Sequence, residues 1–513
     1  MLVIVIGTIV MTELILGPPG TGKTTSLLKC VEEELARGTP PRTIAYVSFT
    51  RRAADEAIDR ACSKFNLLRD DLPYFRTLHS LCFRALGMRK TDVFEGEKVQ
   101  EWANYFGVRV TGRWSEDGTY TGFADGDRIL MIDNLSRVRQ VGLREQYDET
   151  RDAHLSWTMI ESACDSLERF KEEHALKDFT DMLTEFVNSN IEIPLNVLVV
   201  DEAQDLSALQ WRVVDKLAKT ARRVIIAGDD DQAIYCWAGA DVDHLVNLKA
   251  DVKVLDQSWR VPKAVQEIAN QLVELVNHRR PKTWRPRLGG DGIVERAVEF
   301  ESIDLSGDDI MILVRNDFVL KAVEGYLRQQ AIFYEKKGHP SIKKSWLNAI
   351  IAWEKLRTGD MVPVHDIRNV YDCMSSKIGV AHGYKKILGT YDDEMLMGIA
   401  NLKSHAGLLV DSIWHDALDR IPIGEREYIL SARRNGEKFN LRPRVRLSTI
   451  HTAKGAEAKH VVLMLEVARL TDRECDVRPD DELRVWYVAV TRAKERLTLV
   501  EPQSRNSLRC RWL

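Results

Sequence analysis

The segment from residue 14 to residue 28, LILGPPGTGKTTSLL, limits the fold of this chain more than any other feature. Its central eight residues, GPPGTGKT, match the spacing G-x-x-x-x-G-K-T. The three apolar residues before them are typical of the end of a buried strand, and the residues after them are typical of a helix. A strand, a glycine-rich turn and a helix in this order form a phosphate loop within a parallel α/β sheet.

In such a loop the glycines let the backbone curl until its N–H groups point at phosphate oxygens. Lys23 supplies a positive charge to the outer phosphates, and the hydroxyl of Thr24 is placed to ligate Mg²⁺. We therefore predict a site for a nucleoside triphosphate and Mg²⁺. Its expected nucleotide-binding residues here are Gly17, Pro18, Pro19, Gly20, Thr21, Gly22, Lys23, Thr24 and Thr25.

Composition sets the remaining limits. A chain of 513 residues with 44% apolar and 29% charged residues is expected to form several globular domains. The net charge is −4, from 73 basic and 77 acidic residues, so any surface that binds nucleic acid must be local. The eight cysteines are scattered without a C-x-x-C pair, which predicts free thiols in a reducing compartment and no zinc or iron–sulfur site.

The first ten residues, MLVIVIGTIV, are apolar but lack the basic region and cleavage segment of a signal peptide. The run is too short to span a bilayer, and no other run approaches that length. Two interpretations stay open: a lengthened first strand, or a protein that starts at Met11. We expect a cytoplasmic protein that does not bind a membrane.

Buried-strand patterns recur along the chain and are separated by two charged, helix-like regions. The expected strands are 14–16, 44–49, 74–78, 197–200, 224–227, 252–255, 310–314, 446–450, 460–465 and 497–500, with a helix at 53–62. Continuous β-branched runs such as 197–200 are typical of parallel sheets buried on both faces. The sequence therefore predicts two α/β sheets, each interrupted by a mostly helical insertion.

Carboxylates follow two of these strands. Asp201 and Glu202 end the strand 197–200, where Asp201 would hold Mg²⁺ together with Thr24 and Glu202 would orient and deprotonate the attacking water. The segment GDDDQ at 228–232 follows the next strand. It is either a solvated acidic loop or a site at which Gln232 hydrogen-bonds the γ-phosphate.

Seven segments besides the phosphate loop, in the same order, resemble the motifs of superfamily 1 DNA helicases of the UvrD/Rep/PcrA family. They are SFTRRAA (48–54), TLHS (77–80), DEAQD (201–205), GDDDQAIYCWAGAD (228–241), LDQSWR (255–260), TIHTAKGAE (449–457) and WYVAVTRAK (486–494). The resemblance implies two RecA-like lobes of parallel sheet. The first would comprise 1–87 and 176–245 with a helical insertion at 88–175, and the second 246–329 and 441–513 with a reduced helical insertion at 330–440.

The resemblance also implies roles for single residues. Arg260 and Arg492 would be arginine fingers that reach the γ-phosphate from the second lobe, Trp259 would stack on adenine, and Glu457 would contact the ribose. With them, the expected catalytic residues are Lys23, Glu202, Gln232, Arg260 and Arg492. The expected DNA contacts are Phe49, Thr50, Thr77, His79, Trp237, Thr449 and His451. Aromatic stacking tolerates any base, while hydroxyl and basic groups hold phosphates.

We therefore expect an ATP-dependent DNA helicase, a monomeric motor that acts at junctions of single and double strands, with or without a loading protein. Translocation from 3′ to 5′ follows from the resemblance alone. The alternative is a DNA-stimulated ATPase that strips proteins or mediates recombination without processive unwinding.

Three features depart from the family pattern. No glutamine segment precedes the phosphate loop. Thr25 stands where several members of the family carry an arginine near the base, and Ala238 and Ala456 replace an arginine and a leucine. The basic run 278–282, with Trp284 and Arg285 beyond it, is either a further phosphate-binding patch or a solvated loop.

Overall fold

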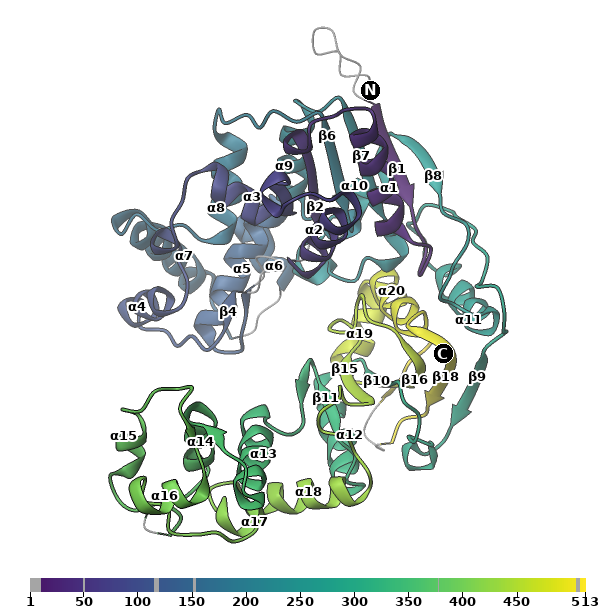
Figure 1. Cartoon of the computed structure of the whole chain (residues 1–513). Coiled ribbons are helices and arrows are strands. Elements are labelled where there is room, and N and C mark those ends of the chain that lie inside the picture. The colour runs from purple at the N-terminus through teal and green to yellow at the C-terminus, as the bar shows by residue number, and fades with distance from the viewer. Residues whose placement is uncertain (1–10, 49–50, 115–119, 151–153, 377, 504–507) are drawn as a thin grey trace. The chain divides into compact units, whose positions relative to one another are not determined.

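The computed structural model describes residues 11–48, 51–114, 120–150, 154–376, 378–503 and 508–513. The chain divides into two compact units: unit 1 is Met1–Asp291 with Glu474–Thr491, and unit 2 is Gly292–Arg473 with Arg492–Leu513 (Figure 1). The extension considered for residues 1–10 and the candidates Phe49 and Thr50 lie outside the described residues. The fold is the predicted one, an α/β protein with two parallel sheets and helical insertions.

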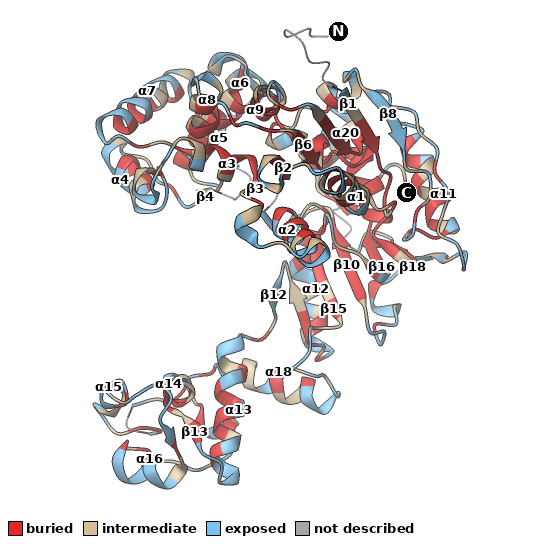
Figure 2. Ribbon diagram, turned by 45° about the horizontal axis from the view of Figure 1, so that its top comes forward, coloured by how far each residue is buried: buried red, intermediate tan, exposed pale blue. Residues whose placement is uncertain are grey.

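Unit 1 contains a six-stranded sheet in the order β3-β2-β6-β7-β1-β8, and every neighbouring pair in it is parallel. Its strands are β1 (Met11–Leu16), β2 (Ile44–Ser48), β3 (Tyr74–Thr77), β6 (Val197–Asp201), β7 (Arg223–Gly228) and β8 (Asp251–Val254). β2 and β6 are buried at every position, as Figure 2 shows, which agrees with their continuous apolar sequences. All of the strands expected in this part of the chain are present.

The edge strand β8 pairs with β1, from Glu13 opposite Asp251 to Leu16 opposite Val254. All four of its residues are exposed. We expected residues 251–254 in the second lobe, within 246–329. They belong instead to the sheet that carries the phosphate loop. The helices α11 (Lys263–Val273) and α20 (Pro479–Val490) pack on each other in the same unit.

Helices cover both faces of this sheet. Because successive strand residues point to opposite faces, Leu14 and Leu16 belong to one core cluster and Ile15 to the other. One face packs against α1 (Lys23–Ala36) and α2 (Arg51–Phe65), and the other against α3 (Leu78–Ala85), α8 (Phe179–Asn188), α9 (Ala208–Ala218) and α10 (Val242–Asn247). The carboxyl ends of the strands are left to carry the loops that hold polar side chains.

The insertion in unit 1 has its own core around Trp102 and is mostly helical, as expected. Its elements are α4 (Glu97–Phe106), β4 (Arg113–Trp114), β5 (Tyr120–Thr121), α5 (Asp125–Arg139), α6 (Leu143–Thr150) and α7 (Trp157–Glu173). A buried ion cluster ties it to α8: the carboxylate of Asp178, which is fully buried, accepts hydrogen bonds from Arg137 at 2.8 Å and from Lys171 at 2.7 Å. The same carboxylate caps the first turn of α8.

Unit 2 contains a seven-stranded sheet in the order β12-β11-β15-β10-β16-β18-β9, parallel throughout except for the β11–β12 pair. Its strands are β9 (Ile293–Ala297), β10 (Ile310–Val314), β11 (Tyr334–Lys336), β12 (His339–Pro340), β15 (Val445–Thr449), β16 (Ala458–Met464) and β18 (Ala493–Val500). The expected strands at 310–314, 446–450, 460–465 and 497–500 are all confirmed.

The helical insertion of unit 2 shares one continuous hydrophobic core with the sheet, since Ile312 of β10 and Trp353 of α13 belong to the same cluster. The remaining elements are α12 (Asp317–Gln329), α13 (Lys344–Thr358), β13 (Val362–Pro363), α14 (Val364–Asp372), α15 (Tyr384–Leu388), β14 (Leu396–Met397), α16 (Ile399–His405), α17 (Trp414–Ala417), α18 (Ile423–Arg434), β17 (Glu466–Val467), α19 (Arg469–Val477) and β19 (Leu508–Arg509). Across the described ranges, no helix combines the length and apolar character that a membrane crossing requires.

Candidate active site

The phosphate loop lies between the end of β1 and the start of α1, and hydrogen bonds to backbone carbonyls hold its shape. The N–H of Gly17 donates to the carbonyl oxygen of Gly228 at the end of β7, 3.0 Å away. Gly20 and Gly22 have φ angles of +72° and +81°, which L-residues with a side chain rarely adopt. The Nζ of Lys23 donates to the carbonyl of Gly17 at 2.9 Å, so the loop wraps around the lysine.

A carboxylate faces the first turn of α1. Thr24 Oγ1 donates to Asp201 Oδ2 at 3.2 Å, and the hydroxyl of Tyr46 donates to the same oxygen at 2.6 Å. Burial, and then the charge of Glu202, raise the pKa of Asp201 to about 6. A buried carboxylate whose ionised form is disfavoured in this way gains from a nearby cation.

The oxygens of Thr24 and Asp201 fit Mg²⁺, which takes few protein ligands and completes its shell with phosphates and water. A group of three or more histidine, cysteine or acidic side chains suited to a resident metal is absent from the described residues. The sequence prediction did not include Tyr46, because a tyrosine within an apolar strand is ordinarily a packing residue.

Glu202 and Gln232 are joined by a chain of hydrogen bonds. The Nε2 of Gln204 donates to Glu202 Oε2 at 2.5 Å, and Gln204 Oε1 accepts from the N–H of Asp229 at 3.0 Å. Asp229 Oδ2 in turn accepts from Gln232 Nε2 at 2.6 Å. Glu202 itself has a φ of +53°, a left-handed conformation that costs about 1 kcal/mol or more and is typical of functional positions.

The acidic run Asp229–Asp231 is not a solvated loop, because its three residues are at most 1% exposed. The Nζ of Lys282 lies 3.1 Å from Asp229 Oδ1, 2.6 Å from Asp230 Oδ1 and 2.8 Å from Asp231 Oδ2. Arg279 binds both carboxylate oxygens of Asp231, at 2.7 and 2.6 Å.

The basic run 278–282 is therefore neither a solvated loop nor a phosphate-binding patch, the two interpretations that the sequence left open. Arg279 and Lys282 neutralise buried carboxylates, and Arg280 donates to the backbone carbonyls of Leu245 and Leu248. The carboxylate partners of Arg279 and Lys282 lie about fifty residues away in sequence, so a local charge count could not identify them.

Residues 258–260 lie directly on the phosphate loop. Ser258 Oγ donates to the carbonyl of Pro19 at 2.7 Å, and the N–H of Trp259 donates to the carbonyl of Gly20 at 2.8 Å. Trp259 is 69% exposed. We expected Arg260 in the second lobe; instead it belongs to unit 1, because β8 adds to the first sheet and brings the residues after it to the loop.

Four predicted residues belong to unit 2. Arg492 is 2% exposed, and its carbonyl accepts from the N–H of Ala458 at 3.1 Å. Glu457 Oε1 accepts from Lys494 at 3.3 Å. Thr449 ends β15, and half-buried His451 follows it two residues later.

Two of the expected DNA contacts in unit 1 border a hollow of about 910 Å³. Thr77 caps the start of α3, and buried His79 packs edge-on against the ring of Phe179. The other residues that line the hollow include Arg76, Arg84, Phe83 and Trp114. Burial, and then the charge of Arg84, lower the pKa of Arg76. Trp237 lies on a different loop and is 48% exposed.

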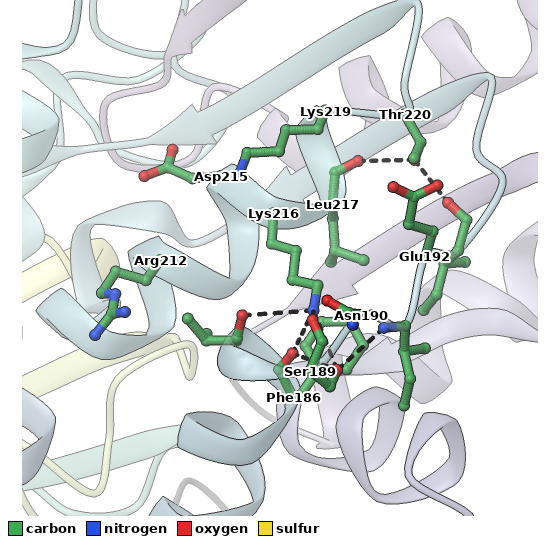
Figure 3. Close-up of a pocket in the computed structure, with 13 residues that line it drawn as sticks. Phe186, Ser189, Asn190, Glu192, Arg212, Asp215, Lys216, Leu217, Lys219 and Thr220 are labelled. Atoms are coloured by element: carbon green, nitrogen blue, oxygen red, sulfur yellow. Dashed lines mark hydrogen bonds between the residues drawn. The ribbon is translucent and has the colours of Figure 1, made fainter.

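Figure 3 shows a second hollow, of about 670 Å³, between the end of α8 and α9. The Nζ of Lys216 donates there to the carbonyls of Phe186 and Ser189, each at 2.5 Å. It thereby satisfies backbone carbonyls at the end of α8, which is a structural role. None of the predicted site residues lines this hollow.

Residues 6–253 match the model of the UvrD/REP helicase N-terminal domain, and residues 426–504 match that of the UvrD-like helicase C-terminal domain. The chain is 22% identical over 604 residues to the ATP-dependent DNA helicase PcrA of Staphylococcus aureus (strain Mu50 / ATCC 700699), covering 96% of this chain and 81% of that protein. It is 24% identical over 286 residues to the PcrA of Bacillus subtilis (strain 168), covering 52% and 38%.

Proposed function

The chain belongs to the UvrD-like family of ATP-dependent DNA helicases, and we propose that it translocates on single-stranded DNA from 3′ to 5′ and unwinds duplex as ATP closes and opens its two lobes. One observation carries the catalytic part of this proposal. The phosphate loop, the carboxylates Asp201 and Glu202, and the segment 258–260 meet at the carboxyl edge of one parallel sheet. In open α/β sheets ligands bind at this edge.

The proposed nucleotide site consists of the phosphate loop and the two carboxylates at the carboxyl end of β6. Lys23 pairs with the outer phosphates, and Thr24 and Asp201 hold Mg²⁺. ATP with Mg²⁺ supplies the phosphoanhydride bond whose hydrolysis drives movement. Glu202 orients water and accepts its proton, and its carboxylate is held by Gln204 at 2.5 Å.

The remaining nucleotide contacts are assigned to residues that follow the motifs. The Gln232 amide is oriented by Asp229 at 2.6 Å and would hydrogen-bond the γ-phosphate. Arg260 and Arg492 are proposed as arginine fingers. Exposed Trp259 is available to stack on adenine, and Glu457 is assigned to the ribose.

We propose that single-stranded DNA contacts Thr77, His79 and Trp237 in unit 1 and Thr449 and His451 in unit 2. The hollow beside Thr77 and His79 supports this path, because aromatic side chains there can stack on bases and arginines can pair with phosphates. The lowered pKa of Arg76 beside Arg84 indicates positive charges that a bound phosphate would stabilise. We further propose that the active species is a monomer.

The proposal is tested by strand displacement on duplexes with a 3′ or a 5′ single-stranded tail, together with ATP hydrolysis with and without single-stranded DNA. We expect DNA-stimulated hydrolysis and unwinding from the 3′ tail, both lost in Lys23→Ala. Hydrolysis that DNA does not stimulate, or that survives Lys23→Ala, would refute the assignment. Stimulated hydrolysis without displacement on a forked duplex would instead identify a translocase that strips proteins.

A further inference from the structure

Three carboxylates in a row are buried directly after β7, a few residues from the proposed catalytic groups. Asp229 and Asp230 are 0% exposed and Asp231 is 1% exposed. Removing an ionised carboxylate from water costs several kcal/mol unless cations and hydrogen bonds compensate. The cation common to all three is Lys282, whose side chain is also 1% exposed. Its ammonium lies within 3.1 Å of an oxygen of each of the three carboxylates.

The Asp229 carboxylate connects this cluster to the site of hydrolysis. One oxygen lies 3.1 Å from Lys282 Nζ, and the other accepts the Gln232 amide at 2.6 Å. The backbone N–H of Asp229 donates to Gln204 Oε1, and Gln204 Nε2 donates to the carboxylate of Glu202. Lys282 therefore contacts the residue to which Gln232 is bonded directly and Glu202 is bonded through Gln204.

We propose that Lys282 is a positioning residue for ATP hydrolysis: by holding Asp229, it fixes the orientation of Gln232 and, through Gln204, of Glu202. Arg279 assists by holding Asp231 at 2.7 and 2.6 Å. The inference rests on the proposed function of Glu202 and Gln232. Lys282 does not touch ATP in this scheme, so its loss should slow the chemical step more than it weakens nucleotide binding.

The segment that carries Lys282 is anchored on two other parts of unit 1. The carboxylate of Asp480, in the first turn of α20, accepts from the N–H groups of Asn277 at 3.1 Å and His278 at 2.9 Å. Beyond Lys282, the carbonyl of Arg285 accepts from the N–H of Ser258 at 2.9 Å. Ser258 in turn is bound to the phosphate loop. The segment is thus fixed at both ends, which gives the ammonium of Lys282 a defined position.

Arg280 provides a matched control within the same segment. Its guanidinium donates only to backbone carbonyls, those of Leu245 and Leu248, among the hydrogen bonds described for its side chain. Arg280→Met therefore removes a long, partly buried cation without removing a charge from the carboxylates. Both Arg280→Met and Lys282→Met should lower the melting temperature, but only Lys282→Met should disturb Asp229.

The test measures kcat and KM for ATP with saturating single-stranded DNA in the parent, Lys282→Met and Arg280→Met. For Lys282→Met we expect kcat to fall by about 10- to 100-fold, because a misplaced general base slows the chemical step by about this factor. KM should change by no more than about twofold. Arg280→Met should keep the parental kcat. A parental kcat in Lys282→Met, or an equal fall in Arg280→Met, would overturn the inference alone, whereas an inactive parent would overturn the proposed function with it.

A second variant covers the case in which Lys282→Met does not fold. In Lys282→Met with Asp230→Asn, one buried carboxylate is removed together with the cation, and Arg279 still holds Asp231. This pair should fold, because the imbalance of buried charge is no greater than in the parent. We expect it to remain slow, because Asp229 has still lost its cation; a parental kcat in the folded pair would refute the positioning role.

Discussion

The contact between the phosphate loop and the segment 258–260 can be tested with two substitutions in the same loop. Gly20 and Gly22 both have a left-handed backbone, with φ of +72° and +81°. A Cβ at Gly20 would lie 2.4 Å from Arg260 Cβ and 3.0 Å from Ser258 Oγ. A Cβ at Gly22 would meet no atom nearer than Thr25 Cβ at 3.9 Å. Gly20→Ala and Gly22→Ala therefore share the backbone strain and differ in the collision.

The left-handed conformation costs alanine about 1–2 kcal/mol at either position. At Gly20 the added carbon must also move from 2.4 Å to an ordinary carbon contact of about 3.5 Å, which displaces the segment 258–260 by about 1 Å. That shift breaks the bonds from Trp259 N to the Gly20 carbonyl and from Ser258 Oγ to the Pro19 carbonyl. At about 1 kcal/mol for each bond, the segment loses about 2 kcal/mol of its local stability.

Hydrogen–deuterium exchange without nucleotide measures this loss at the Trp259 amide. A loss of about 2 kcal/mol predicts about thirty-fold faster exchange in a peptide that covers 256–262 of Gly20→Ala. The same peptide in Gly22→Ala should exchange at the parental rate. Equal acceleration in the two variants, or none in Gly20→Ala, would show that the segment is not seated on the loop.

Three other perturbations follow from the structure. Glu202→Gln should lower kcat for ATP by about 10²- to 10⁴-fold and leave binding of a fluorescent ATP analogue intact; a small effect on kcat would exclude Glu202 as the base. Trp237→Ala should weaken binding of single-stranded DNA by about 1–3 kcal/mol, measured by anisotropy, without changing KM for ATP in the absence of DNA. Asp178→Asn should destabilise the protein by about 3–5 kcal/mol, because Arg137 and Lys171 lose a buried partner. Burial alone would raise the pKa of Asp178, but Arg137 and Lys171 lower it below the ordinary 3.8. Its stabilisation is therefore complete above about pH 4 and lost as the pH falls further, so thermal midpoints should decline more steeply there in the parent than in Asp178→Asn.

The strands were predictable because parallel strands buried on both faces have continuous apolar sequences. The expected 197–200 and 310–314 appear as β6 (Val197–Asp201) and β10 (Ile310–Val314). The phosphate loop and the pairing of Thr24 with Asp201 were also predictable, since both residues follow strands in one parallel sheet. What such patterns do not contain is the identity of each strand's neighbour, and β8 was therefore placed with the wrong sheet.

Charge patterns were harder to interpret than strand patterns. The acidic run 229–231 and the basic run 278–282 each resemble a solvated loop when considered alone. The structure pairs them, with Lys282 between three carboxylates. The opposite charges of the two runs could have suggested the pairing, but their spacing in the chain gave no means of choosing Lys282 over Arg280.

The order of the strands explains why so many separate motifs make one site. β7 lies between β6 and β1, and β8 lies on the other side of β1. The segments that follow these four strands are hydrogen-bonded in the same order: Gln204 to Asp229, Gly17 to Gly228, and Ser258 to Pro19.

These bonds form a continuous rim from Glu202 to the segment 258–260, although two directly bonded residues in it, Pro19 and Ser258, are 239 residues apart in sequence. The phosphate loop is bonded on both of its sides, by Gly17 to Gly228 at the end of β7 and by Pro19 to Ser258. Hydrogen bonds therefore connect the phosphate loop to the strand end that precedes Asp229 on one side and to the segment bearing Trp259 and Arg260 on the other.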